Sequence, residues 1–362
     1  MIVPLTVRLL PLAAGTLIAI TLWFVPRLTR ADLYFAVTVA PGFRDSSDGI
    51  LILRRYRREL FGVSTVALGL LAGLALTPAL PLAPLGLLVQ LGAYYCVFFR
   101  ARRLVLTHAV PPTTVREAQI TARNRRIFGG WLAASGPFCL LAVCAGYLWL
   151  HWGQIPTQLV VHWNAQGKPD RWAVRNLGSV FFPLLTTATI LAALTLLLYG
   201  IAHWLRPIYT GGIQGARESR FRRTVSALLL ATEYLLALQS SWIAIQPLLP
   251  GSNQRPAGGV ALLLPLLVVI GFVVSLMRLG QGGSRMSASQ TSESAPIGPV
   301  GDRTEDRFWK LGIFYFNRSD PAVLVEKRFG IGYTMNFGHP VAWAILLLIV
   351  LAPIVIARLS HG

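Results

Sequence analysis

A polar segment, residues 151–177, separates two long apolar stretches and contains side chains whose chemistry suits ligand binding. His162 and Asp170 are the strongest pair, with His151 as a third candidate, since imidazole and carboxylate groups are common metal ligands. The three are irregularly spaced, so no metal site is predicted. The favoured interpretation is a folded loop in which His162 and Asp170 hydrogen-bond to its own backbone.

The same segment predicts an antiparallel hairpin. Apolar and polar residues alternate over residues 160–163, and residues 171–174 can return as a second strand. Asn164 and Gly167 lie between the two strands, and both residue types tolerate the positive φ angles that tight turns require.

A second polar set lies inside an apolar stretch, residues 225–249, where Glu233 is the only carboxylate outside the predicted loops. The polar side chains of this stretch share one helical face: Thr232, Glu233, Gln239, Ser240 and Gln246. Because such a face is costly in lipid, it should point into a helix bundle. It could serve as a proton, ion or ligand pathway, or it could supply interhelical hydrogen bonds, which is the commoner use.

A third set lies near the C-terminus, in residues 308–339, which combine dense aromatic residues with turn-forming and basic ones. We predict a hairpin with strands near 313–316 and 323–325, and a further turn at Gly330 and Gly332. A segment this short buries only part of its apolar surface alone, so it either docks on a partner or the membrane, or packs on its own chain. The candidate docking residues are Tyr315, Asn317, Asp320, Pro321, Lys327, Arg328, Gly330, Gly332 and Asn336.

The elements that position these side chains are helices. A membrane span needs roughly 17 to 25 largely apolar residues, and eight stretches qualify: 5–26, 60–78, 82–99, 128–150, 178–205, 225–249, 258–277 and 340–357. The composition agrees, since 54% of residues are hydrophobic and 13% are charged. The sequence predicts an all-α integral membrane protein with about eight transmembrane helices, a small external hairpin loop and a small cytoplasmic module.

The domain organisation follows from these spans. Residues 1–277 form a seven-span membrane region with an external loop at 151–177, and 278–301 form a Gly/Ser-rich flexible linker. Residues 302–339 form the cytoplasmic module, and 340–362 form the last span and tail.

The basic residues predict the orientation. The chain carries a formal net charge of +19, and most of its lysines and arginines lie in alternate loops. Since cytoplasmic loops are enriched in basic residues, these loops should be cytoplasmic and both termini outside. The bases are spread over four loops and form no single stripe, so no nucleic-acid partner is expected.

No catalytic motif accompanies these elements. The sequence contains no HExxH, CxxC, phosphate loop or GxSxG, and its six histidines are scattered. We therefore expect neither an enzyme nor a cofactor.

Two segments resemble known families. The segment IPTQLVVHWNAQGKPDRWAVRN (155–176) resembles the sixteen-forty-eight domain of unknown function, which is found in SdpI-like bacterial membrane proteins. The resemblance selects the candidate binding residues of the external loop: Pro156, His162, Asn164, Gly167 and Asp170. The segment FYFNRSDPAVLVEKRFGIGYTMNFGHP (314–340) is similar to the fifty-eight-oh-eight domain of unknown function, which often accompanies the first.

The resemblance implies a protein of the bacterial inner membrane with a toxin-immunity or signal-sensing role. Its partners would be membrane lipid, a secreted peptide toxin outside and a cytoplasmic regulator inside. The C-terminal segment of the SdpI family, with a Gly-Tyr-Arg-type motif after a span, is absent from the sequence. The alternative function is a transporter or channel that uses the polar face around Glu233.

Overall fold

The protein is predominantly helical in the computed structural model, which describes residues 5–111, 128–163, 169–205, 212–249, 259–280 and 304–361. These ranges contain eight long helices: α1 (Leu5–Leu28), α2 (Ser47–Leu76), α3 (Ala83–Leu106), α4 (Gly130–Leu150), α5 (Leu177–His203), α6 (Gly212–Ile245), α7 (Gly259–Leu279) and α8 (Pro340–His361). Short 3-10 helices lie at Phe43–Asp45, Leu80–Leu82, Trp152–Gln154, Gln246–Leu248 and Asp306–Phe308. Most of the predicted linker, residues 281–301, falls outside the described residues.

Six of these helices, α1 to α6, contain stretches long and apolar enough to cross a membrane. In the described parts of α7 and α8, the apolar stretches are shorter, at Val269–Leu279 and Pro340–Leu351. Large apolar side chains also cover the outside of the helices, for instance Leu132 and Leu150 on α4, far more than a soluble surface exposes. The protein is therefore an all-α multi-pass membrane protein, as predicted, while the count of eight spans stays a prediction.

Helices α2 and α6 begin well before the apolar stretches that predicted them. The first turns of α2 are charged on one side but bury Ile52, Leu53 and Tyr56 on the other. The Ser46 hydroxyl accepts a hydrogen bond from the Gly49 N–H at 3.2 Å and caps the helix. An amphipathic helix can extend past the lipid in this way, whereas hydropathy detects only its membrane-embedded part.

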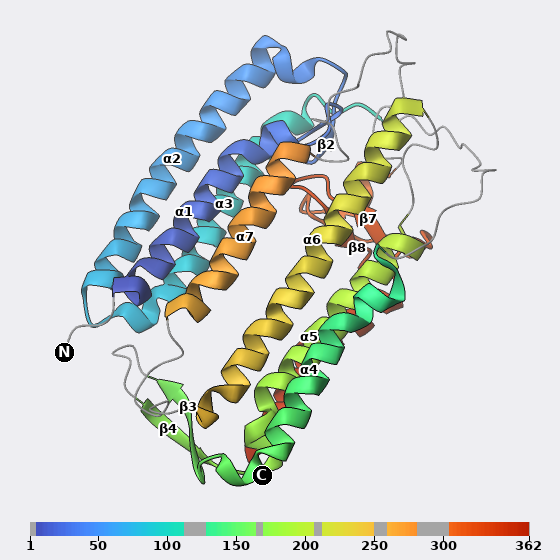
Figure 1. Ribbon diagram of the computed structural model, residues 1–362. Coiled ribbons are helices and arrows are strands. Elements are labelled where there is room, and N and C mark those ends of the chain that lie inside the picture. Colours follow the sequence, from blue (N-terminus) through green and yellow to red (C-terminus); the bar gives the residue numbers. More distant parts are fainter. Residues whose placement is uncertain are drawn as a thin grey trace.

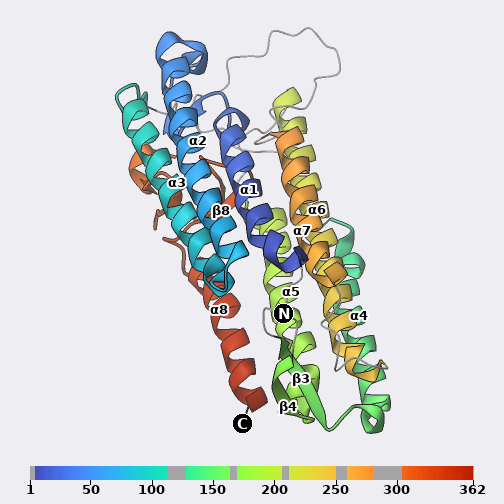
Figure 2. The ribbon, with the colours of Figure 1, turned by 90° about the vertical axis from the view of Figure 1, so that its left-hand side faces the viewer.

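The helices pack as two groups of three that follow the sequence (Figures 1 and 2). In the first group α2 packs on both α1 and α3, and in the second α6 packs on both α4 and α5. Helix α7 lies between α1 and α6, and α8 packs along α5. The central helix of the first group, α2, is the second in sequence, whereas that of the second group, α6, is the third. The two groups therefore do not share one packing pattern.

Four two-stranded antiparallel hairpins occur within the described residues: β1 (Leu33–Tyr34) with β2 (Val37–Thr38), β3 (Gln158–Trp163) with β4 (Pro169–Val174), β5 (Trp309–Lys310) with β6 (Phe314–Tyr315), and β7 (Leu324–Glu326) with β8 (Tyr333–Met335). The hairpin β3–β4 lies at one end of the bundle, near the start of α1 and the end of α8 (Figure 1). The hairpins β1–β2 and β7–β8 lie toward the other end.

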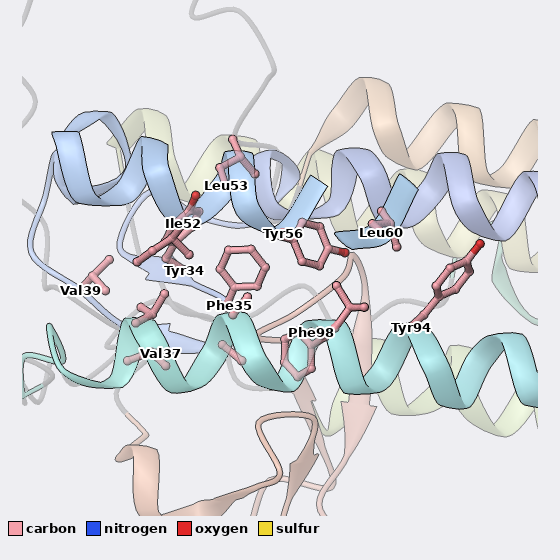
Figure 3. Packing of buried hydrophobic residues seen from close by; sticks show 14 residues of the cluster. Tyr34, Phe35, Val37, Val39, Ile52, Leu53, Tyr56, Leu60, Tyr94 and Phe98 are labelled. Carbon is pink, nitrogen blue, oxygen red and sulfur yellow. The ribbon is translucent and has the colours of Figure 1, made fainter. Parts of the chain in front are cut away.

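The best-packed core surrounds the tight turn between β1 and β2, which is inserted between α2 and α3 (Figure 3). Phe35, in this turn, is fully buried and lies 4.9 Å from Tyr56 and 6.4 Å from Phe98, measured between ring centroids. Phe35 and Ala36 both have positive φ angles, 44° and 63°, a conformation that non-glycine residues rarely adopt. Their strain persists because the surrounding aromatic core holds the turn in place.

Candidate functional site

The predicted hairpin β3–β4 exists, with Leu159 opposite Ala173 and Val160 opposite Trp172. His162 Nδ1 lies 2.5 Å from Asp170 Oδ1, and both side chains are exposed. The two therefore bond to each other across the strands, and among the described residues this pair takes the place of the predicted bonds to the loop backbone. Asn164 and Gly167 lie outside the described residues, while Pro156 is half-buried just before β3.

The hairpin is fixed to the helices on either side of it. Arg175 donates to the carbonyl oxygens of Trp152 at 3.0 Å and Ile155 at 2.6 Å, so it ties the end of β4 to the end of α4. The Asn176 side chain accepts from the Ser179 N–H at 2.7 Å and caps α5. Leu159 is buried against α4 and α5. The hairpin is therefore attached to both α4 and α5.

Glu233 lies in the interface between α5 and α6 and is completely buried. One carboxylate oxygen, Oε2, accepts a hydrogen bond from the Thr195 hydroxyl at 3.2 Å. The other, Oε1, has no hydrogen-bond partner among the described residues. A buried oxygen with no donor costs free energy and is unusual in a structural role.

The polar residues predicted to share one face of α6 fall into a buried set and a half-buried set. Glu233 and Ser240 lie on the buried face, and the Ser240 hydroxyl donates to the Pro183 carbonyl oxygen on α5 at 2.7 Å. Thr232 bonds to its own helix, at Leu228, and Gln239 and Gln246 are half-buried at the side. The face of Glu233 and Ser240 points into the bundle, as predicted, but Thr232, Gln239 and Gln246 flank it.

A second intramembrane polar network, in the first helix group, was missed by the sequence interpretation. The buried Gln90 amide donates to the Gly15 carbonyl oxygen at 3.1 Å and to the Tyr94 hydroxyl at 2.7 Å. The Tyr94 hydroxyl lies 2.8 Å from that of Ser64, so the network links α1, α2 and α3. The four-residue spacing of Gln90, Tyr94 and Phe98 was the signal that could have found it.

The C-terminal module, residues 304–339, is built around Asn336, which is completely buried. Its side-chain amide donates to the Asn317 carbonyl oxygen at 2.8 Å and accepts from the Asn317 N–H at 3.0 Å. Tyr315 donates to Asp320 at 2.9 Å nearby. Four of the candidate docking residues therefore hold the module together.

The predicted pairing of strands in this module was wrong. Strand β6 pairs with β5, and β7 pairs with β8, so the segment at Asp320 and Pro321 connects two hairpins and is not the turn of one. The β5–β6 turn uses Leu311 at φ 54°, and leucine is not a residue that marks such turns in a sequence. The predicted turn at Gly330 and Gly332 is present, and both have positive φ angles.

Arg328 is the most deeply buried charge of the module, with no exposed side-chain surface. Its guanidinium bonds to the Asp306 carboxylate and to the Thr304 carbonyl oxygen, and lies 5.2 Å from the centre of the Trp309 ring. Asp306 also accepts from the Thr38 hydroxyl on β2 at 3.0 Å. Arg328 is therefore an internal clamp; of the other docking candidates, Pro321 and Lys327 are exposed.

The module contacts both helix groups. Toward the first group, Phe329 lies 4.2 Å from Phe98 and 6.1 Å from Phe35, measured between ring centroids. Toward the second, Leu324 packs with Ile201 on α5 and Phe221 on α6. The module therefore joins the two groups at this end of the bundle, and the possibility that it packs on its own chain is realised.

Two arginines beside the strained β1–β2 turn were also missed: Arg102, which is buried, and Arg44, which is half-buried. Arg102 on α3 donates to the carbonyl oxygens of Phe35 at 3.2 Å and Ala36 at 2.6 Å. Arg44 donates to the Thr29 carbonyl oxygen at 3.0 Å. Burial lowers the pKa of Arg44 to about 10, so it stays charged at neutral pH. The position of Arg102, four residues after Phe98 on the buried face of α3, was a readable signal.

Fold and sites together define a multi-pass membrane protein with a hairpin at one end and a clamped module at the other. Residues 139–187 match the family described as Domain of unknown function (DUF1648), which covers the end of α4, the hairpin β3–β4 and the start of α5. Residues 318–343 match the Family of unknown function (DUF5808), which covers most of the module and the start of α8. Both are the domains expected from the sequence. No curated protein and no solved structure matches the chain.

Proposed function

We propose that this protein is a non-catalytic receptor or immunity protein of a bacterial inner membrane. In this proposal the hairpin β3–β4 meets a secreted peptide outside the cell, and the C-terminal module passes the signal to a cytoplasmic regulator. Both termini are then external. The proposal is supported by the match to the two domains of unknown function, which the sequence resemblance associates with SdpI-like proteins, and by the way the structure connects them.

The observation that carries the proposal is the continuous path along α5. The helix begins two residues after β4, at the Asn176 cap, and is packed along its length by α8, which follows the module. At its other end Gly200 leaves room for the module, because a β-carbon there would lie 2.9 Å from Leu324 Cδ1. A small displacement of the hairpin would therefore shift a helix that contacts the module directly.

Cysteine labelling from outside intact cells tests the orientation. Cys96, Cys139 and Cys144 are first replaced by alanine, and single cysteines are introduced as Trp172→Cys on the hairpin and Pro321→Cys on the module, both at exposed positions. A membrane-impermeant maleimide should label the hairpin variant at least ten-fold more than the module variant before the cells are opened, and equally afterwards. Preferential labelling of the module in intact cells would contradict the orientation.

The survival of cells that carry each variant, measured in the presence of the host's secreted peptide fraction, tests the role of the hairpin. The double variant His162→Ala/Asp170→Ala removes the exposed pair, and we expect at least a ten-fold loss of protection at equal membrane abundance. Gln158→Ala, an exposed change on β3 far from the turn, is the matched control and should protect normally. Full protection by the double variant would remove these residues from the binding site.

A transporter is the second candidate, favoured by the Oε1 atom of Glu233, which has no hydrogen-bond partner in the described part of the chain. If the carboxylate carries protons or ions, Glu233→Gln should lower flux into proteoliposomes at least ten-fold while the melting temperature stays within a few degrees. Thr195→Val, which removes its hydrogen-bond donor but keeps the charge, should retain most of the flux. Equal flux in wild type and Glu233→Gln would show that the residue has a structural role only.

A further inference from the structure

Five exposed arginines form a band on the outside of α2 and α3, and we call it the arginine belt: Arg54, Arg55, Arg58, Arg100 and Arg103. The two helices are antiparallel neighbours joined by a short connection (Figures 1 and 2). Since the belt lies near the start of α2 and near the end of α3, its arginines come to one level. The Glu59 carboxylate marks this level, because it lies 3.0 Å from Arg55 and 3.7 Å from Arg100.

The belt is not neutralised from within the described part of the chain. Glu59 is shared by two arginines, while Arg54, Arg58 and Arg103 make no ion pair with any described residue. Arg103 lies 4.8 Å from the centre of the Phe99 ring, a contact that leaves its charge uncompensated. Several exposed guanidinium groups in one band, without enough carboxylates to neutralise them, favour the binding of an external anion.

Neighbouring side chains place the belt at the edge of the lipid. On α2, Phe61 follows Arg58 by about one helical turn and is 67% exposed, and on α3 Leu88, about three turns before Arg100, is 64% exposed. Trp23 on α1 lies 5.0 Å from the Arg57 guanidinium, and tryptophan is enriched where a membrane meets water. Apolar residues on the same faces therefore lie in the hydrocarbon region, and the arginines lie beside the headgroups.

We propose that the arginine belt binds the phosphate groups of anionic phospholipids in the leaflet on the module's side of the membrane. Guanidinium groups bind phosphate through paired, charge-assisted hydrogen bonds. The lipid is favoured over an acidic protein because the exposed apolar residues on the same two helices, Phe61 and Leu88, suit the hydrocarbon region next to the belt. Bound lipids would brace the end of the first helix group that holds the strained turn.

Native mass spectrometry of protein extracted from mixed bilayers of phosphatidylglycerol and phosphatidylcholine tests the proposal. The triple variant Arg54→Gln/Arg58→Gln/Arg103→Gln should bind phosphatidylglycerol roughly 100-fold more weakly, since each arginine near a charged bilayer contributes about a factor of five. The matched control Arg220→Gln/Arg278→Gln/Arg318→Gln removes three exposed arginines elsewhere and should lose no more than about a factor of five.

Three outcomes would overturn the proposal. Equal losses in the two triple variants would mean that binding follows net charge alone, and no loss in the first would mean that the belt is not the site. Displacement of bound phosphatidylglycerol by soluble polyglutamate, at concentrations that leave the triple variant unaffected, would identify an acidic protein as the partner. The melting temperature of each variant in neutral detergent should match wild type, because all six side chains are exposed.

Discussion

Replacing Arg328 by alanine should release the C-terminal module from the helix bundle and cost about 3–5 kcal/mol of stability, the usual effect of removing one partner of a buried ion pair. The Asp306 carboxylate would lose its guanidinium partner and retain the weaker hydrogen bond from the Thr38 hydroxyl. The Trp309 ring would also lose the cation that lies 5.2 Å from its centre. Thermal unfolding in detergent measures the loss of stability, and protease sensitivity of residues 304–339 measures the release of the module.

Arg318→Ala is the control for this change, because Arg318 is an exposed arginine in the same module. It lies 5.8 Å from the centre of the Phe316 ring and should cost less than about 1 kcal/mol. If Arg328→Ala is no more sensitive to heat or protease than Arg318→Ala, the module is held by its aromatic contacts alone. The clamp assigned to Arg328 would then be refuted.

Replacing Phe35 by alanine should be comparably severe, costing about 3–5 kcal/mol, as large-to-small changes of buried aromatic residues do. Phe35 is fully buried between Tyr56 and Phe98 and also contacts Phe329 of the module. The change leaves a cavity at the junction of α2, α3 and the module. We therefore expect both a lower melting temperature and faster proteolysis of the module.

Phe61→Ala separates these effects from the general loss of an aromatic ring. Phe61 lies on α2 with 67% of its surface exposed, on a face that we place against lipid. Its removal opens no cavity inside the protein, so the melting temperature should shift by only a few degrees. A larger shift from Phe61→Ala than from Phe35→Ala would show that the turn is not the centre of this core.

Arg328→Ala and Phe35→Ala together test whether the module and the strained turn form one unit. Arg102 bonds to the turn from α3, and Phe329 packs on it from the module. If the module and the turn form one unit, the double variant Arg328→Ala/Phe35→Ala should lose less stability than the sum of the two single losses. The effects of changing residues in one cluster are not additive. In the proposed receptor, this junction is where a signal from α5 would be released or held.

The sequence alone determined the membrane character and the apolar part of each helix, although not where α2 and α6 begin. A bilayer requires each span to satisfy its own backbone hydrogen bonds, so spans are long apolar helices whose signal is local in the chain. The hairpin β3–β4 was also readable, since only five residues separate its strands in the sequence. For the same reason, the turn at Gly330 and Gly332 was predicted correctly.

Only the tertiary structure decided which polar groups are buried together. Thr38 and Asp306 meet across 268 residues, and Arg30 approaches Glu326 at 3.5 Å. The sequence presents these residues as ordinary polar loop residues, because their partners come from distant segments that meet only when the helices and the module assemble. Whether Arg328 is a docking residue or a clamp depended on the same fact: a charge is buried or exposed according to what packs over it, and no local pattern records that.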